Sequence, residues 1–338
     1  MNAPAPPDPG LVRGLALARR ALGPAATLTE VARDASTRRF YRAAAGPSTA
    51  ILMAHGEALA PDAPLFTNHR ILAAIGAPVP RLIDRDEAAG LVLVEDFGDL
   101  TLQRHLLTTG AGAAPPYYHQ AGDLIALFQG GAPAAMHPDD FAARNALDRE
   151  RFLFELEHFH RHYVRGLRGL TPTAPEEALM RRFYADLAAD CDRLPRVYCH
   201  RDFQSRNLMV MGERLGLVDF QDARMGPYTY DAASLLRDSS LDLEPALVQE
   251  MLDRLLRSIA APLGIGPEEF GRDFNLMALE RNIKDLGTFG YMATERDRKD
   301  YLAYIPRTLE SIRRTVAGDR RWHHIHPWLE RFVLGWAG

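Results

Sequence analysis

The sequence predicts an α+β fold in two lobes, a small antiparallel β-sheet lobe followed by a larger and mostly helical lobe. The chain has 338 residues, which is long for a single hydrophobic core. Strand-type segments occupy much of residues 27–95, whereas apolar residues recur at helical spacing through most of the chain after residue 100. These observations place the link between the lobes near residues 95–100.

The first lobe is predicted to span residues 11–99, after a Pro-rich tail over residues 1–10 that we expect to be flexible. Apolar residues at helical spacing predict helices over 11–23 and 64–76, the second ending at Gly76. Segments rich in β-branched and apolar residues predict strands, and turn residues separate them. These strands are expected within 27–55, at 81–84 and at 91–95, with a hinge at 95–99.

The second lobe is predicted to span residues 100–338. Its helical segments are expected at 117–129, 148–166 and 176–194, and further helices run to the C-terminus. A single β element interrupts them, a hairpin with strands at 207–211 and 215–219. The apolar stripe along 176–194 is typical of a packed core, which we favour over a cofactor-binding surface.

Composition excludes several classes of function. The net charge is −4, and the arginine-rich stretches are interleaved with acidic and apolar residues, so no nucleic-acid partner is expected. No apolar stretch reaches the roughly 20 residues that cross a bilayer, and no secretory signal is present, so we expect a cytoplasmic protein without a membrane partner. Cys191 and Cys199 lack the spacing of zinc ligands and are expected to be reduced core thiols. We expect a monomer.

Two polar motifs flank the predicted hairpin, HRDFQSRN at residues 200–207 and LVDFQD at residues 217–222. Phosphoryl transfer requires an oriented acceptor hydroxyl and a divalent metal that neutralises phosphate charge. Asp202 in the first loop is the candidate catalytic carboxylate. Asn207 and Asp219, at the two ends of the hairpin, are candidate ligands of Mg²⁺, which prefers oxygen donors.

These motifs match the kinase-type loop in which an Asn follows five residues after an Asp, with a D-F element beyond it. The chain resembles the aminoglycoside phosphotransferase and choline kinase superfamily, and within it the anomeric kinases of N-acetylmuramate and N-acetylglucosamine. The resemblance implies a protein-kinase-like fold, ATP and Mg²⁺ as cofactors, and a structural role for Asp231. It covers nearly everything from about residue 25 onward, and the matching segments are 34–42, 79–81, 95–99, 200–209, 219–227, 230–231, 234–238, 280–287 and 301–307.

The resemblance also implies a nucleotide site in the first lobe. Residues 34–39 would form the loop around the phosphates, although no GxGxxG pattern is present. Without the resemblance, an ordinary hairpin turn with surface arginines would be the better interpretation. The hinge would meet the adenine through backbone groups. The predicted nucleotide-binding residues are Ser36, Thr37, Arg38, Arg39, Glu95 and Phe97.

The chain departs from the superfamily pattern at one position. Such kinases usually carry a Lys on the third strand that holds the α- and β-phosphates, and Met53 stands in its place. The helix over 64–76 also lacks a Glu partner for such a Lys, with Asn68 or His69 nearest. Because the Lys and its Glu partner are both absent, neither charge is left without a partner. The alternative interpretation is a weakened or inactive kinase.

An acceptor pocket is expected beside Asp202 in the second lobe. An acid and aromatic rings on the helix over 148–166 suit a sugar, whose hydroxyls bond to carboxylates and whose ring stacks on aromatics; they would also suit a quaternary ammonium. Arg281 and Lys284 are candidates for binding a substrate carboxylate. Arg224 is as well explained as a surface arginine. The predicted substrate-binding residues are Glu155, His158, Phe159, Arg224 and Arg281.

The resulting hypothesis is an ATP-dependent sugar kinase that phosphorylates the C1 hydroxyl of N-acetylmuramate, N-acetylglucosamine or both, in peptidoglycan recycling. One alternative is another small-molecule kinase with an aminoglycoside, choline or amino-alcohol acceptor. The arginine- and histidine-rich segment 307–331 counts modestly against a polycationic acceptor. The other alternative is a nucleotide-binding pseudokinase without catalytic activity, which Met53 alone supports.

Overall fold

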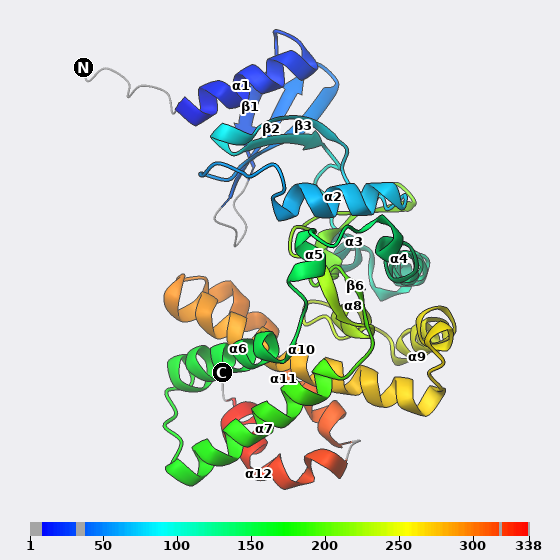
Figure 1. Cartoon of the computed structure of the whole chain (residues 1–338). Coiled ribbons are helices and arrows are strands. Elements are labelled where there is room, and N and C mark those ends of the chain that lie inside the picture. Colours follow the sequence, from blue (N-terminus) through cyan, green and yellow to red (C-terminus); the bar gives the residue numbers. More distant parts are fainter. Residues whose placement is uncertain (1–8, 32–37, 318–319, 337–338) are drawn as a thin grey trace, which may run out of the picture.

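The two lobes are arranged one above the other in the computed structural model, which describes residues 9–31, 38–317 and 320–336 (Figure 1). The upper lobe holds a five-stranded sheet with two helices, and the lower lobe is mostly helical. The predicted α+β class with a small antiparallel sheet is therefore confirmed. No helix in these described ranges is both long and apolar enough to cross a bilayer.

The sheet of the first lobe is antiparallel throughout, with the strand order β1-β2-β3-β5-β4. The tight β2–β3 turn predicted from the sequence is present, with Gly46 at φ 62°, a backbone conformation that glycine adopts without strain. The strands are β1 (Thr27–Glu30), β2 (Arg39–Ala45), β3 (Ser48–Ala54), β4 (Leu82–Asp86) and β5 (Leu91–Glu95).

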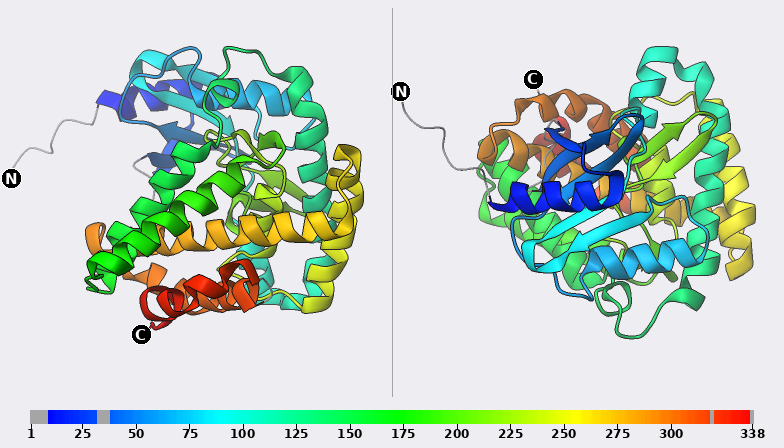
Figure 2. Two further views of the ribbon diagram at one scale, coloured as in Figure 1. Left: turned by 60° about the horizontal axis from the view of Figure 1, so that its bottom comes forward. Right: turned by 90° about the horizontal axis from the view of Figure 1, so that it is seen from above.

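Two helices cover opposite faces of this sheet, because alternate strand residues point to opposite sides. α1 (Pro9–Leu22) packs on one face, where Leu17 joins Leu52 and Leu93 in a small separate core. α2 (Pro64–Ala74) lies on the other face, and its apolar residues join Val92 in the main core of the protein. The right-hand view of Figure 2 shows α1 lying across the sheet. α2 therefore connects the sheet to the helical lobe.

The helical lobe is built around α10 (Pro267–Glu295), which is buried along most of its length. π-helical segments extend α6 over His160–Leu167, α9 over Leu256–Ala260 and α12 over Leu329–Leu334. The other helices are α3 (Leu102–Thr109), α4 (Ala114–Ala135), α5 (Phe141–Arg144), α6 (Arg149–Phe159), α7 (Ala174–Asp192), α8 (Tyr230–Leu236), α9 (Pro245–Leu255), α11 (Ile305–Ala317) and α12 (His326–Trp328).

The helical lobe contains two small β-ladders where the sequence predicted one. The predicted hairpin is present as β7 (Leu208–Met211) and β8 (Arg214–Leu217). The second ladder pairs β6 (Arg196–Cys199) with β9 (Arg224–Pro227), so the expectation of a single β element is wrong. Each of these strands has only four residues, and residues 200–223 lie between them in the sequence. Because no short turn connects the two strands, the sequence carries no local signal for their pairing. Cys191 and Cys199 are buried free thiols, as expected.

α10 approaches α6 and its π-helical extension so closely that glycine is required at the contact. A Cβ on Gly287 would lie 2.6 Å from the Cα of Phe159, and one on Gly290 would lie 2.5 Å from the carbonyl oxygen of His162. The obstacle is backbone at both positions, which side-chain repacking cannot relieve. These contacts fix α6, and with it Glu155, against the centre of the lobe.

We expect Gly287→Ala to lower the free energy of unfolding by about 1–3 kcal/mol, because the added methyl group overpacks a rigid contact. Gly271→Ala is the matched control, since Gly271 lies on the same helix and a Cβ there meets nothing within 4 Å. That control should gain about 1 kcal/mol from helix propensity. Urea denaturation of the two variants checks this, and equal stabilities would contradict the close-contact explanation.

Candidate active site

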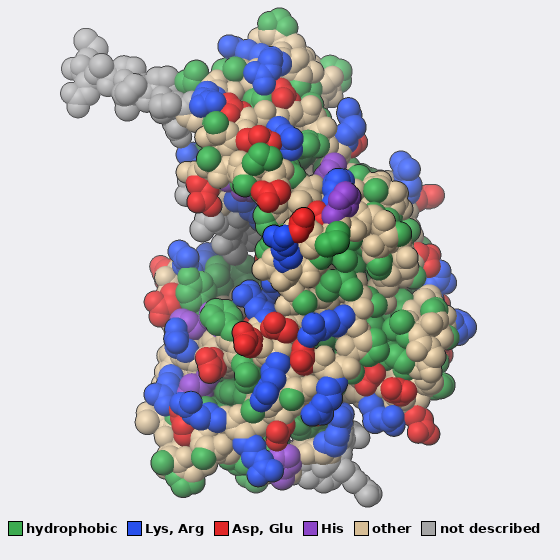
Figure 3. Space-filling view, viewed as in Figure 1, with side chains coloured by type: hydrophobic (Ala, Val, Ile, Leu, Met, Phe, Trp, Pro, Cys, Tyr) green, Lys and Arg blue, Asp and Glu red, His purple; other side chains and the backbone are tan. Residues whose placement is uncertain are grey.

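The candidate catalytic residues lie where the two small β-ladders of the helical lobe face the sheet lobe. The catalytic loop leaves β6 and enters β7, and Asp219 follows β8 before the chain continues to β9. The polar residues that follow β6 and β8 therefore lie at the same end of the two ladders. Figure 3 shows that the surface is hollowed on one side between the lobes. The structure therefore brings Asp202, Asn207 and Asp219 together, as the motif spacing predicted.

A buried carboxylate braces the catalytic loop from below. Asp231 in α8 accepts hydrogen bonds from the backbone N–H groups of His200, at 2.7 Å, and Arg201, at 3.0 Å. Arg201 has φ 76°, a conformation that costs energy in a non-glycine residue, and the two bonds hold it there. Burial raises the pKa of Asp231, although these bonds oppose the shift. The structural role expected for Asp231 is confirmed.

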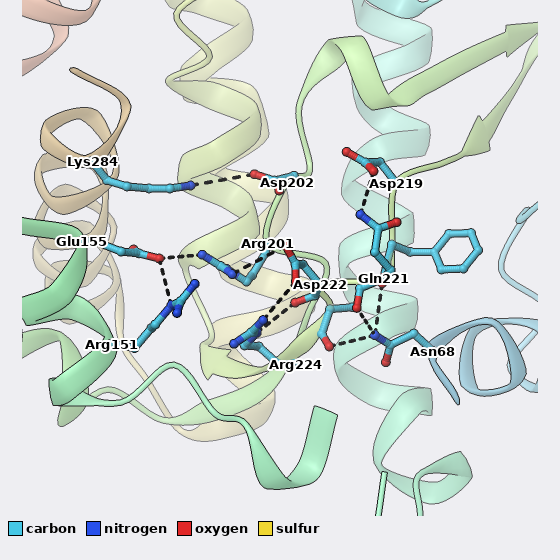
Figure 4. A network of polar contacts seen from close by, with 12 residues as sticks. Asn68, Arg151, Glu155, Arg201, Asp202, Asp219, Gln221, Asp222, Arg224 and Lys284 are labelled. Carbon is cyan, nitrogen blue, oxygen red and sulfur yellow. Dashed lines mark hydrogen bonds and ion pairs between the residues drawn. The ribbon is translucent and has the colours of Figure 1, made fainter. Parts of the chain in front are cut away.

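Asp202 faces two cations from α10. Its Oδ1 lies 3.8 Å from Nζ of Lys284 and 4.0 Å from Nη1 of Arg281, and Figure 4 shows Lys284 pointing at it. Burial would raise the pKa of Asp202, but the charges of Lys284, Arg201 and Arg281 outweigh it and hold the pKa well below the usual range. Asp202 is therefore an anion at neutral pH, suited to orienting an acceptor hydroxyl.

Asn207 and Asp219 present oxygen atoms that fit a hard divalent cation. Nδ2 of Asn207 donates to the carbonyl of Asp202 at 2.8 Å, which fixes the amide and leaves Oδ1 as its acceptor. Asp219 adopts φ 65° at the end of β8, and Gln221 donates to its Oδ1 at 2.8 Å. In the described part of the chain, no cluster of three or more His, Cys, Asp or Glu could hold a metal. A Mg²⁺ ion here would thus need phosphate oxygens and water to complete its shell.

Asn68 ties α2 to the loop that carries Asp219. Its Nδ2 lies 3.0 to 3.2 Å from the carbonyl oxygens of Phe220, Gln221 and Ala223, and its Oδ1 accepts from the hydroxyl of Tyr198 at 3.2 Å. The side chain is fully buried. The sequence marked Asn68 only as the nearest polar residue to a missing Glu, and nothing local indicated that it bonds the loop backbone. The amide of Asn68 therefore fixes the backbone of the loop that follows Asp219.

The predicted phosphate-loop residues separate in the structure. Ser36 and Thr37 lie outside the described residues. Arg38 directs a guanidinium nitrogen to Oδ1 of Asp219 at 2.9 Å, and its side chain is only 17% exposed. Arg39 instead pairs with Glu30 on the neighbouring strand, and 40% of its side chain is exposed. Arg38 therefore points into the site, whereas Arg39 lies along the outer face of the sheet.

The predicted hinge is fixed by contacts on both sides. A carboxylate oxygen of Glu95 accepts from the backbone N–H of Arg81 at 3.2 Å. The ring of Phe97 lies so close to Gly216 on β8 that a Cβ there would come within 2.6 Å of it. Arg42 on β2 bonds the carboxylates of both Asp96 and Asp99. The link between the lobes is thus anchored to the sheet and to the helical lobe at once.

Three predicted substrate residues take part in a buried ionic network beneath Asp202, and Figure 4 shows two of them, Glu155 and Arg224. Glu155 is 4% exposed and pairs with Nη2 of Arg201 at 2.5 Å. Arg224 bonds the carbonyl of Asp222 at 3.0 Å and its carboxylate at 3.2 Å. Arg281 is 1% exposed. As they lie here, these residues support the catalytic loop from within the protein.

The remaining two predicted substrate residues lie in different surroundings. Phe159 is completely buried in the main core, so it presents no surface to a ligand in this structure. His158 is partly exposed, and its ring centroid lies 4.3 Å from that of His162 and 5.5 Å from that of Tyr291. Burial and the charge of His162 lower the pKa of His158 to about 4, so the imidazole of His158 is neutral at pH 7.

The matched family model and curated relatives agree with this geometry. Residues 27–267 match the model of the phosphotransferase enzyme family. The chain is 31% identical over 309 residues to the N-acetylmuramate/N-acetylglucosamine kinase of Neisseria meningitidis serogroup B, covering 89% of this chain and 88% of the relative. It is 30% identical to the enzyme of the same name from Pseudomonas aeruginosa, with 87% and 85% covered.

Solved structures share the fold at low sequence identity. A choline/ethanolamine kinase family protein from Mesorhizobium loti superposes with a TM-score of 0.58 at 16% identity, covering 91% of this chain and 94% of that chain. An aminoglycoside phosphotransferase in ternary complex with AMP-PNP and hygromycin B gives a TM-score of 0.57 at 14% identity, with 90% and 99% covered. The expected protein-kinase-like architecture is therefore confirmed.

Proposed function

Because the chain belongs to the phosphotransferase enzyme family, we propose that it transfers the γ-phosphoryl group of ATP to the C1 hydroxyl of N-acetylmuramate and N-acetylglucosamine. The observation that carries the transfer chemistry is the meeting of Asp202, Asn207 and Asp219 between the lobes. The choice of acceptor rests on the names of relatives that match nearly the whole chain at about the same length.

In this proposal each polar group has a distinct task. Asp202, held as an anion by Lys284 and Arg281, orients the acceptor hydroxyl for in-line attack and accepts its proton. Asn207 and Asp219 would hold Mg²⁺, which supplies charge neutralisation on the transferring phosphoryl group. Asp231 keeps the loop backbone in place throughout. The chemistry is thus mainly positioning and electrostatic stabilisation.

We place the two substrates on opposite sides of this centre. Residues 11–99 would hold the nucleotide, with the adenine against the hinge at Glu95–Phe97, and residues 100–338 would hold the sugar. The partly exposed rings of His158, His162 and Tyr291 offer an aromatic surface, which suits the apolar face of a sugar ring. The use of ATP fits a cytoplasmic reaction in the recycling of peptidoglycan sugars.

The test is an ADP-release assay with ATP and Mg²⁺ against N-acetylmuramate, N-acetylglucosamine, choline, homoserine and kanamycin. We expect turnover on the N-acetyl sugars, and no turnover on their methyl glycosides, because the glycoside blocks the C1 hydroxyl. Turnover on a methyl glycoside would exclude C1 as the acceptor. Turnover on choline or kanamycin alone would replace the proposed substrate. No turnover with any acceptor, with ATP still bound, would favour a pseudokinase.

A further inference from the structure

Strand β3 of the sheet lobe carries no cation. β3 reads STAILMA, and Met53 pairs with Phe40 on β2 and Val92 on β5. ATP carries several negative charges on its phosphates, and a binding site normally neutralises them with Lys or Arg as well as metal. If this site binds ATP, the cation therefore has to come from another element.

Arg38 lies where such a cation is needed. It immediately precedes β2, and the β2–β3 register runs from Ala45↔Ser48 to Arg39↔Ala54, so Arg38 is at the end of the sheet where Met53 lies. Its guanidinium reaches Oδ1 of Asp219 at 2.9 Å from a side chain that is only 17% exposed. Burial and the charge of Arg38 also lower the pKa of His55, the residue after β3, to about 4. Arg38 thus lies between the end of β3 and the candidate metal ligand.

We propose that Arg38 supplies the phosphate-binding cation in place of a lysine on β3, and that it leaves Asp219 when nucleotide and metal bind. The inference rests on the proposed ATP-dependent function. An arginine fork bonds two phosphate oxygens at once, which makes it a suitable substitute for an ammonium group. In the present arrangement Arg38 holds a carboxylate oxygen of Asp219, so it would compete with a metal ion for this carboxylate. Phosphates that draw Arg38 away would free that oxygen, so nucleotide and metal binding should reinforce each other.

The first measurement is nucleotide affinity in the full-length protein, by calorimetry with ATP and Mg²⁺. We expect Arg38→Met to weaken ATP binding by about 10- to 100-fold, the effect of losing a charge-assisted hydrogen-bonding group. Arg39→Met tests the neighbouring arginine and should weaken binding much less. Arg20→Met is the matched control, since Arg20 lies in the same lobe and pairs with Asp84 on the far face. An effect of Arg38→Met no larger than that of Arg39→Met would overturn the phosphate role.

The second measurement is the binding of Mn²⁺ alone, followed by electron paramagnetic resonance without nucleotide. Here the same variant should change affinity in the opposite direction, because Arg38→Met removes the competitor for Asp219. We expect Arg38→Met to bind Mn²⁺ more tightly than wild type, and Asp219→Asn to bind it more weakly than either. Unchanged Mn²⁺ affinity in Arg38→Met would overturn the proposed competition.

A compensating variant shows whether Arg38→Met weakens ATP binding because the positive charge is lost or because the fold is damaged. Arg38→Met combined with Met53→Lys returns a positive charge to the site from β3, and we expect it to recover about 10-fold in ATP affinity. Arg38→Lys should retain part of the affinity for the same reason. The proposal would be overturned if neither variant bound ATP more tightly than Arg38→Met does. These readouts need no sugar, so wild-type ATP binding without sugar turnover would reject only the proposed acceptor.

Discussion

Asp202→Asn is expected to lower kcat by about 10²- to 10⁴-fold while ATP binding is retained. Asparagine keeps the shape of the side chain but removes the negative charge that orients the acceptor hydroxyl and takes its proton. The nucleotide contacts proposed above involve other residues, so the Kd for ATP should change little. Steady-state kinetics with the active sugar, together with calorimetry for ATP, measure the two quantities separately.

The lowered pKa of Asp202 adds a pH-dependent expectation. Lys284, Arg201 and Arg281 outweigh the effect of burial, so the folded protein keeps this carboxylate ionised below the pKa of a free aspartate. Its contribution to stability is present above that unfolded value and is lost only as pH falls toward the lowered one. The pH–rate profile of the wild type should therefore show no fall between pH 8 and pH 5 that is due to protonation of Asp202. Full transfer by Asp202→Asn, with Asp190→Asn as a partly exposed control, would refute the assignment.

The proximity of the three candidate catalytic residues was predictable because its signal is local. A segment of 18 residues contains Asp202, Asn207 and Asp219. It forms a loop and a hairpin, and the turn of the hairpin can be recognised from its residue types. The strands of the first lobe are likewise marked by segments rich in apolar and β-branched residues and by turn residues such as Gly46. In each case neighbouring residues determine the structure, so that pattern and spacing are sufficient.

Features that depend on distant contacts could not be predicted in the same way. β6 and β9 pair residues that are 25 to 31 positions apart in the sequence, and no turn between them signals the ladder. The three backbone bonds of Asn68 connect residues more than 150 positions apart. Helical spacing correctly placed Glu155 and Phe159 on a helix, but it could not show that they pack against α10 and Arg201. Tertiary packing decided which polar residues support the loop from below.

Glu155→Gln is expected to lower the free energy of unfolding by about 3–5 kcal/mol, the usual cost of breaking a buried ion pair. Glu155 is the close anionic partner of Arg201, whose next acidic contact, Asp222, lies 4.0 Å away. Without Glu155 the arginine remains buried among the nearby cations Arg151 and Arg281. Because Arg201 immediately precedes Asp202, kcat should fall together with stability. A rise in KM at unchanged stability would instead support the substrate-binding role predicted from the sequence.

Glu280→Gln is the matched control, because Glu280 is a second fully buried carboxyl in the same region. Neither of its oxygens has a hydrogen-bond partner among the residues that the structure describes. Burial and the charge of Glu155 raise the pKa of Glu280 well above its usual range. The folded protein thus keeps Glu280 protonated at pH values where the unfolded chain has lost the proton. Glutamine resembles that neutral form, so this substitution should be far less harmful than Glu155→Gln.

The sign of the pH effect distinguishes the two carboxyls further. For an acid whose pKa is raised on folding, stability is lost as pH rises above the unfolded value. As the pH rises from the unfolded pKa toward the raised pKa of the folded protein, Glu280→Gln should therefore gain stability relative to wild type, by up to about 1.4 kcal/mol per pH unit. Glu155→Gln should remain less stable than wild type across this range. Urea denaturation at pH 5, 6, 7 and 8 measures both trends, and a flat difference for Glu280→Gln would show that Glu280 is not held neutral by the fold.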